Sequence, residues 1–379
     1  MVLKIAPILK KKPTRKLMIQ KKLWKKNQRS LEIMLETKKV LICLTGGKSS
    51  TVLLDLIFNG LSQDNHKKLR IIPFFLHLTG IEQKEHDLKT AELIIRQCQH
   101  YNFNIYVVNI SKFYLQNNNT LPEQNSTTEI INWTVSDPEA NIKEILKKLT
   151  PTTSNDVEKR IKRDIFIRVA SELQCKYIFT AETTTTLAIN LLSNLVIGRG
   201  SQVENDVGFS DNRHENIKIL RPMKDITEEE LHHYIKVNKL NSVSTDHIRK
   251  NSLQSTIKTF VSDLQENFPA TISTVCKTAD KISSTENNPK RCQMCKSYFN
   301  MMTEKMTAIQ ATIFSRTVSN CQPSEYYNVD QNTNVKSPLD HHHHKTSMFP
   351  YIDNKLCYSC SKNYLERGLQ DIFEIKSNP

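Results

Sequence analysis

The stretch LICLTGGKSSTVLLDLIF, residues 41–58, decides the fold. Its apolar start belongs to the run at 38–45, which predicts a buried strand, and its second half carries apolar residues at helical spacing. Between them stands the pair Gly46-Gly47, in a chain that has only eight glycines. A strand, a glycine turn and a helix aim backbone N–H groups and the positive end of the helix dipole at one point. Such a point favours an anion such as phosphate.

The sequence on both sides of this stretch continues to alternate between strand and helix patterns. Further strands are expected at 69–78, 103–110, 176–182 and 217–223, although Pro73 is unfavourable inside the first of them. Helices are expected at 84–101, 138–149, 154–174, 185–197, 227–237, 251–267 and 270–282. This alternation predicts an α/β fold built on a parallel sheet.

Composition divides the chain of 379 residues into three parts. We expect a basic N-terminal arm at 1–35, an α/β domain at 36–283 with a polar insertion near 112–136, and a C-terminal cysteine-knuckle module at 284–379. No apolar run approaches the roughly 20 residues that a membrane-spanning helix needs, so a soluble protein without a membrane partner is expected.

The arm carries a large share of the positive charge. Residues 1–29 contain eleven Lys or Arg and no acid, so the other 350 residues contribute only +3 to the net charge of +14. Such a block attracts polyanions, and the candidate RNA-binding residues in it are Lys10, Lys11, Lys12, Arg15 and Lys16. A solvated basic tail and a mitochondrial presequence are the alternatives, the latter disfavoured because such presequences prefer Arg and Ser over Lys.

The loop after the first strand fits one nucleotide-binding pattern better than another. Gly47-Lys48-Ser49 matches the end of a Walker A loop, but the leading glycine would fall on Ile42. No apolar strand ends in an Asp that could hold magnesium. The P-loop NTPase reading is therefore disfavoured.

The second pattern is the pyrophosphate loop of PP-loop adenylating enzymes, S-G-G-x-D-S. This chain matches five of its six positions if Thr replaces the first Ser, and the acid is replaced by Ser49. The candidate nucleotide-binding residues are Thr45, Gly46, Gly47, Lys48, Ser49 and Ser50. The tRNA-modifying members also carry G-H-N-x-D-D-x-x-E-T after a later strand, where this chain has Thr185 and Thr186 at the acidic pair. The scaffold of a PP-loop (adenine nucleotide alpha hydrolase-like) domain is kept while its charged chemistry is missing, so no catalytic residue is assigned.

Several segments in order carry a more specific resemblance. They are NLLSNLVIGRG at 190–200, GFSDNRH at 208–214, ILRPMKDITEEEL at 219–231, RCQMC at 291–295 and LCYSC at 356–360. Together they resemble the cytoplasmic tRNA 2-thiolation protein 2 family, from about residue 36 to the C-terminus. One departure is that the lysine-rich arm stands where family members usually carry a cysteine-containing segment.

The resemblance implies a cytoplasmic subunit of the complex that 2-thiolates the wobble uridine of tRNA. In that chemistry ATP adenylates the C2 oxygen of the uridine, and sulfur from a thiocarboxylated ubiquitin-like carrier then displaces AMP. The implied partner is a catalytic PP-loop subunit, in a heterodimer where that subunit binds most of the ATP. Two alternatives stay open: a self-sufficient tRNA-adenylating enzyme that uses Lys48, and an RNA-binding scaffold that binds no nucleotide.

Two cysteine pairs, Cys292-x-x-Cys295 and Cys357-x-x-Cys360, stand 61 residues apart. Each pair can present two thiolates to one metal, and two pairs complete the four-thiolate set of structural zinc. Reduced unligated cysteines, a redox pair and an iron–sulfur site are the alternatives. Cys321 and the run His341–His344 lie between the pairs and are expected to be loop residues. The remaining cysteines are expected to be buried structural residues, namely Cys43, Cys98, Cys175 and Cys276.

Arg199 is the second RNA-binding candidate, because it is flanked by Gly198 and Gly200 at the end of an expected helix. A solvated arginine beside a helix cap explains the same pattern equally well. The basic cluster at 159–163 is a third candidate, although charge on an exposed helix face is common. Arg213 and His214 are pointed out only by the family resemblance.

Overall fold

The computed structural model describes residues 37–62, 69–80, 84–115, 121–126, 142–200, 203–214, 216–243, 251–281, 291–297 and 355–364. They form two compact units, one with the described residues up to 281 and 362–364, the other with those between 286 and 361. The arm and most of the polar insertion lie outside these residues, and the expected domain boundaries stay predictions. No described helix is long and apolar enough to cross a membrane.

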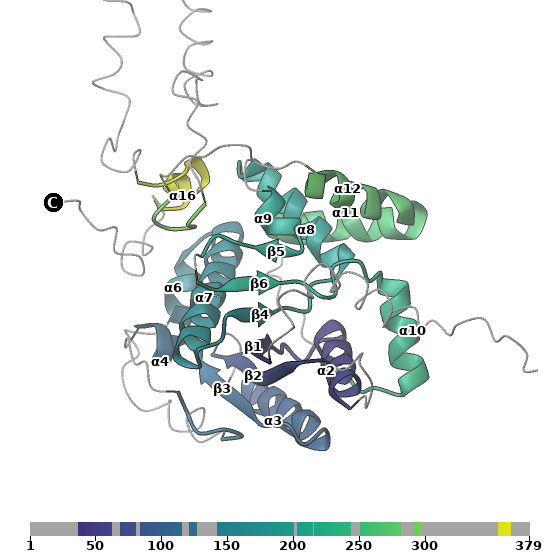
Figure 1. The fold of residues 1–379 in the computed structure, drawn as a ribbon. Coiled ribbons are helices and arrows are strands. Elements are labelled where there is room, and N and C mark those ends of the chain that lie inside the picture. Colours follow the sequence, from purple (N-terminus) through teal and green to yellow (C-terminus); the bar gives the residue numbers. More distant parts are fainter. Residues whose placement is uncertain are drawn as a thin grey trace, which may run out of the picture. The chain divides into compact units, whose positions relative to one another are not determined.

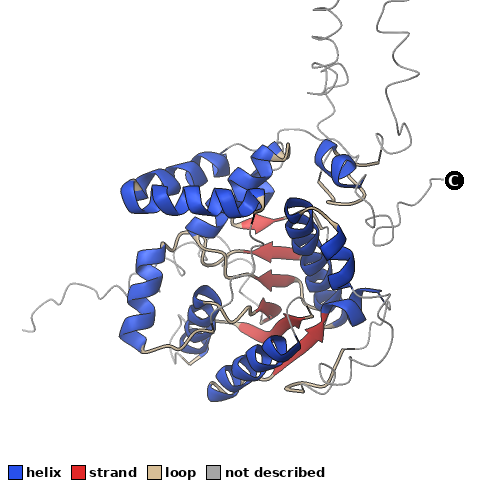
Figure 2. Cartoon of the chain, turned by 180° about the vertical axis from the view of Figure 1, so that it is seen from behind, coloured by secondary structure: helices blue, strands red, loops and turns tan. Residues whose placement is uncertain are grey.

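The first unit is built on a six-stranded sheet in the order β3-β2-β1-β4-β6-β5, labelled in Figure 1 and seen from behind in Figure 2. Its strands are β1 (Lys38–Cys43), β2 (Ile71–Thr79), β3 (Ile105–Asn109), β4 (Tyr177–Phe179), β5 (Ser210–Asp211) and β6 (Lys218–Leu220). All neighbouring pairs are parallel except β5 with β6. The expected parallel α/β fold is confirmed. Pro73 is tolerated within β2 because the pairing with β3 begins only at Phe75.

Helices cover both faces of the sheet (Figure 1). One face is covered by α2 (Lys48–Leu61), α3 (Lys84–His100) and α10 (Glu228–Asn238). The other face carries α4 (Ile110–Leu115), α6 (Ile142–Lys148) and α7 (Pro151–Glu172). Beyond β5 and β6 lies a helical layer of α8 (Thr184–Val196), α9 (Val203–Val207), α11 (Leu253–Asn267) and α12 (Pro269–Lys281). The helix α16 (Tyr358–Tyr364) begins directly after Cys357 and contains Cys360, the last paired cysteine.

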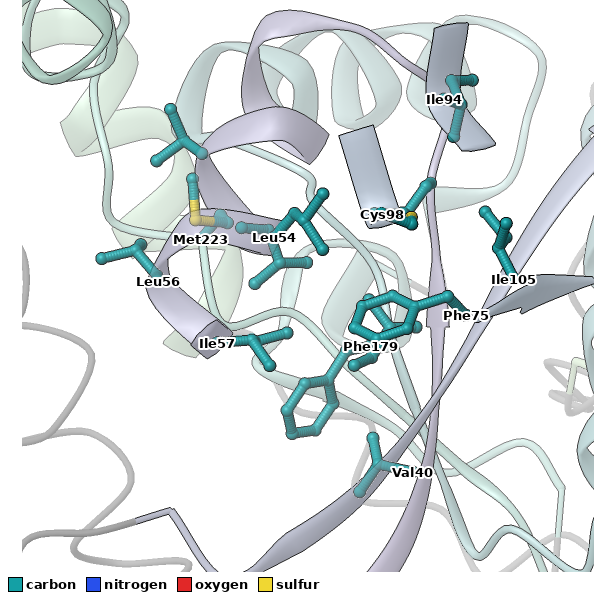
Figure 3. Packing of buried hydrophobic residues seen from close by; sticks show 14 of the residues in the cluster. Val40, Leu54, Leu56, Ile57, Phe75, Ile94, Cys98, Ile105, Phe179 and Met223 are labelled. Atoms are coloured by element: carbon teal, nitrogen blue, oxygen red, sulfur yellow. The ribbon is translucent and has the colours of Figure 1, made fainter. Parts of the chain in front are cut away.

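The main core lies between the sheet and the helices α2, α3 and α10. Side chains from β1, β2 and β3 meet those of α2 and α3 there, as Val40, Leu54, Phe75, Ile94 and Ile105 show (Figure 3). Each of these five side chains is at most 1% exposed. This packing fixes the start of α2, and with it the glycine loop, against the sheet.

The helical layer has a separate core. It is formed by buried residues of α8, α9, α11 and α12, among them Leu187, Leu191, Val207, Val261 and Ile272. The short elements α4, α9 and β5 were not expected from the sequence, because a few residues give no measurable period.

Candidate functional site

The loop at 45–50 lies at the carboxyl end of β1, beside the loop that follows β4. The chain leaves β1 for β2 and β3 on one side of the sheet and later returns to β4 on the other side. The strand order therefore reverses between β1 and β4, and open α/β sheets bind their ligands at such a switch point. These two loops form the candidate nucleotide site.

Gly46 has a backbone conformation that favours glycine. Its φ is +80°, and a Cβ atom added there would lie 2.9 Å from Cδ1 of Ile94. Its carbonyl oxygen accepts a hydrogen bond of 2.9 Å from the backbone N–H of Val243. The glycine turn is therefore held by α3 and by the segment that follows α10.

The hydroxyl groups of the loop bind within the loop. Oγ of Ser50 donates to the carbonyl oxygen of Gly47 at 2.9 Å, and Oγ1 of Thr45 donates to Oγ of Ser50 at 3.4 Å. The backbone N–H of Gly47 points to Oγ1 of Thr45 at 3.4 Å. The loop is a glycine turn held by its own hydroxyl groups, and Ser49 stands where the pyrophosphate-loop pattern has a carboxylate.

Lys48, the first residue of α2, contacts α10. Its Nζ lies 2.8 Å from Nε2 of His232. The other ring nitrogen, Nδ1, lies 2.9 Å from the carbonyl oxygen of Glu228. A carbonyl oxygen only accepts, so Nδ1 carries the proton and Nε2 accepts from the ammonium group.

The loop after β4 also contacts α10. Thr183 is the N-cap of α8, and its hydroxyl group lies 3.4 Å from Oε1 of Glu228, to which it donates. Thr184 donates to the carbonyl oxygen of Lys224 at 2.8 Å. Thr185 and Thr186 stand where tRNA-modifying PP-loop enzymes have an acidic pair. They carry hydroxyl groups and no charge. The first two turns of α10 thus bind both loops of the candidate site, a feature that the sequence did not reveal.

An acidic residue does follow β4, but it is engaged by the protein. Glu182 accepts from Nε of Arg221 at 2.7 Å, from Asn190 at 3.2 Å and from Thr180 at 3.1 Å. Arg221 is only 6% exposed in its side chain. With both oxygens bound to neighbouring side chains, Glu182 serves as the counter-ion of a buried arginine.

Further buried charges lie around Asp211, in the GFSDNRH segment. Its carboxylate binds Arg213 at 2.7 Å and Arg163 at 2.9 Å, and Arg213 also reaches Asp206 at 2.7 Å. Burial raises the pKa of Asp211, but the two arginines outweigh it and hold that pKa well below its usual range. Arg213 and Arg163 therefore stabilise the fold at this point.

Arg199 is held by a carboxylate of α7. Its two terminal nitrogens lie 2.5 and 2.6 Å from the two oxygens of Asp156, and only 10% of its side chain is exposed. Within the 159–163 cluster, Arg160 pairs with the same Asp156, and Lys162 pairs with Glu158. RNA binding by Arg199 stays a prediction. The arm residues Lys10, Lys11, Lys12, Arg15 and Lys16 lie outside the described residues.

The structure brings the four paired cysteines together in the second unit. The Sγ atoms of Cys292, Cys295, Cys357 and Cys360 all lie within 4.8 Å of one another. The Sγ atoms of Cys295 and Cys357 are 3.7 Å apart, and the backbone N–H of Cys357 donates to Sγ of Cys292 at 3.3 Å. Cys292 and Cys360 are fully buried. This arrangement can hold a metal ion.

The other described cysteines are buried single residues, as expected. Burial raises the pKa of the Cys98 thiol to about 12 and that of the Cys175 thiol to about 11, and it also raises the pKa of Cys43. Cys276 lies in the core of the helical layer. The raised pKa values leave Cys43, Cys98 and Cys175 protonated near neutral pH, so none of the three is a ready nucleophile. Cys321 and His341–His344 lie outside the described residues.

Comparison with known proteins agrees with the fold and the motifs. The structure is similar to that of the U34-tRNA thiolase NcsA from Methanococcus maripaludis, solved with its [4Fe-4S] cluster. The TM-score is 0.50 and the identity 18%, over 70% of this chain and 79% of that one. This likeness shows the fold, which is the parallel-sheet α/β fold expected for a PP-loop domain.

The sequence comparisons then give the family. The family model of cytoplasmic tRNA 2-thiolation protein 2 matches residues 252–362. The protein of that name from Drosophila willistoni is 30% identical, over 74% of this chain and 70% of its own length. The Aedes aegypti protein is 28% identical, over 76% and 71%. The chain belongs to the cytoplasmic tRNA 2-thiolation protein 2 family, whose name places its members in the cytoplasm.

Proposed function

We propose that this chain is the non-catalytic subunit of a cytoplasmic complex that 2-thiolates the wobble uridine of tRNA. Its partners would be a catalytic PP-loop subunit, tRNA and a ubiquitin-like sulfur carrier. In the proposed reaction the partner adenylates the C2 oxygen of uridine with ATP, and sulfur from the carrier's thiocarboxylate then displaces AMP.

One observation carries the non-catalytic role. The carboxylates in the motifs of PP-loop enzymes are absent at Ser49, Thr185 and Thr186. The polar groups that remain at the two loops bind other groups of the protein. Lys48 donates to His232 and Thr183 donates to Glu228, so α10 engages both loops of the candidate site. Without a carboxylate at any of the three positions, this site lacks the acidic groups that would hold the magnesium accompanying ATP at those positions.

We also propose that the four paired cysteines hold one structural zinc ion. In tetrahedral coordination at about 2.3 Å, thiolate sulfur atoms stand about 3.8 Å apart. The separation of 3.7 Å between Cys295 and Cys357, and the 4.8 Å limit for all four, fit a single ion. A four-iron cluster binds each thiolate through a different iron atom and therefore holds the sulfur atoms farther apart. The zinc would fix the unit and take no part in sulfur transfer.

The proposed function is tested by genetic deletion and complementation. Deleting the gene should remove 2-thiouridine from the tRNA at the wobble position, measured by mass spectrometry, and the wild-type chain should restore it. A variant with Thr45→Ala and Ser50→Ala should restore it as well. If the deletion strain keeps its 2-thiouridine, the assignment is wrong.

The non-catalytic role is tested with the purified chain. It should show no ATP–pyrophosphate exchange with unmodified tRNA, whereas the chain co-purified with its PP-loop partner should show exchange. Robust exchange by the chain alone would establish the self-sufficient enzyme instead.

A further inference from the structure

Positive residues gather at the end of the sheet opposite the candidate nucleotide site. Four neighbouring parallel strands begin there, and each begins at or directly after a basic residue. The residues are Arg70 before β2, Lys38 and Lys39 in β1, Lys176 before β4, and Lys218 in β6. We call these five residues the basic rim. They come from four separate parts of the sequence, so only the fold reveals them.

The strand register places these residues side by side. The backbone N–H of Lys38 donates to the carbonyl oxygen of Arg70 at 3.3 Å, and that of Lys218 donates to Lys176 at 3.0 Å. Val40 pairs with Tyr177, which sets Lys39 beside Lys176. Because parallel strands are about 4.8 Å apart, the four strand starts span roughly 14 Å.

Three of the rim's charges differ from the arginines of the interior in being exposed. Arg70, Lys176 and Lys218 are exposed, and none of the three has an ion pair with another described residue. Arg199 and Arg213, in contrast, are largely covered and bind carboxylates of the protein. Exposed cations that pair with no carboxylate of the described residues can bind an external anion.

The basic arm is connected to the same rim. The chain enters β1 at Lys38, and only residues 30–37 separate that position from a segment with eleven Lys or Arg. Four of the five rim residues are lysines, which protein–protein interfaces disfavour and phosphate backbones attract.

We propose that the basic rim binds the phosphate backbone of RNA. The inference deepens the proposed function and rests on it, because the RNA would be the tRNA that the complex modifies. It places RNA contacts of this chain on the amino-end side of the sheet, away from the loops at 45–50 and 180–186.

The test uses the full-length chain together with its PP-loop partner and an unmodified tRNA transcript. In the rim variant, Arg70→Gln, Lys176→Gln and Lys218→Gln are combined. The control variant combines Lys236→Gln, Lys277→Gln and Lys281→Gln, which remove three charges on α10 and α12. Affinity is measured by filter binding between 50 and 300 mM salt, taken as about the range in which phosphate contacts dominate.

The rim variant should bind tRNA at least about tenfold more weakly near 0.1 M salt, with a salt slope shallower by about 2 to 3, because each lost phosphate contact removes about 0.9 from it. The control variant should bind like the wild type, and all three proteins should unfold at the same temperature. Equal affinities and equal slopes for rim variant and wild type would overturn the inference.

Two other outcomes separate the possible failures. If the rim variant no longer retains the PP-loop partner in pull-down, and by itself binds tRNA as tightly as the wild-type chain does by itself, the rim is a protein interface and the inference is wrong. If wild-type complex binds no tRNA and the deletion strain keeps its 2-thiouridine, the proposed function itself has failed.

Discussion

Nζ of Lys48 donates a hydrogen bond to Nε2 of His232 over 2.8 Å, although the two residues are 184 positions apart in the sequence. The contact joins the first residue of α2, which belongs to the candidate nucleotide-binding loop at 45–50, to the second turn of α10. In a Walker A loop the lysine after the last glycine faces the phosphates. Here it faces an imidazole ring that is itself fixed by the carbonyl oxygen of Glu228.

Replacing Lys48 should therefore leave tRNA thiolation almost unchanged. Lys48→Met in the complemented deletion strain should give 2-thiouridine within about twofold of the wild type, and the stability lost with this exposed pair should be below about 1 kcal/mol. His232→Ala serves as the matched control, because it breaks the same contact from the other side. A large loss of 2-thiouridine for Lys48→Met alone would show that the ammonium group acts in the chemistry.

Gly46→Ala should destabilise the first unit, whereas Gly47→Ala should not. The φ of +80° at Gly46 costs an alanine about 1–2 kcal/mol, and its Cβ would also press on Ile94. Gly47 has a φ of −69°, which any residue adopts. Urea denaturation of both variants measures the difference. Equal free energies of unfolding would contradict this account of the turn.

The sequence predicted this turn and the strands and helices around it, because each long element carries a clear apolar period. It could not predict that Lys48 meets His232, since such a contact depends on how α10 packs and leaves no local pattern. The same holds for Arg199, whose partner Asp156 lies 43 positions earlier. A glycine-flanked arginine looks the same in the sequence whether it faces RNA or a buried carboxylate.

The cysteine quartet was predictable for the opposite reason. Each C-x-x-C pair is a local pattern that places two thiols close together. The two pairs can then meet at one point because the chain between them is long enough to fold back. The basic rim shows the limit of such reasoning, because Lys176 and Lys218 become neighbours only through the strand order.

The free energy of unfolding should fall in alkaline solution, because Tyr101 and Tyr234 donate hydrogen bonds to Asp55 and lose these protons at high pH. Tyr101 donates to this carboxylate at 3.1 Å, and burial, together with the charge of Asp55, raises the pKa of Tyr101 to about 12. Because the pKa of Tyr101 is higher in the folded protein, its protonated hydroxyl group stabilises the fold. This stabilisation is complete below the unfolded pKa of about 10 and is lost as the pH rises toward 12. The free energy of unfolding, followed from pH 8 to 11.5, should decline less in Tyr101→Phe. Parallel curves for variant and wild type would refute the assignment.

Asp211→Asn should be among the most damaging single changes in the first unit. It leaves Arg163 and Arg213 without their shared buried carboxylate, and breaking a buried ion pair costs about 3–5 kcal/mol. The control is Asp263→Asn on the exposed side of α11, where less than about 0.5 kcal/mol is expected. Because the pKa of Asp211 is depressed, its contribution is present above the unfolded pKa and is lost only as the pH falls far below it. A small effect of Asp211→Asn would mean that the arginines find other partners.

Purified protein should contain one zinc ion per chain, bound through the four paired cysteines. Cys292→Ser removes a fully buried ligand and should abolish stoichiometric zinc, measured by elemental analysis. Cys98→Ser, an equally buried cysteine in the core of the sheet, should keep the full zinc content. Because the thiols must lose their protons to bind the ion, zinc should be released more easily as the pH falls.

Removing the zinc should affect the second unit and leave the sheet folded, because no paired cysteine belongs to the core between the sheet and α2. Treatment with a strong chelator should therefore leave most of the far-ultraviolet circular dichroism and the main thermal transition of the first unit unchanged. If the wild-type protein contained iron and acid-labile sulfide in place of zinc, and Cys292→Ser lost both, the four paired cysteines would move apart to hold an iron–sulfur cluster. Global unfolding by the chelator would show that the ion stabilises both units, contrary to the separation of their cores.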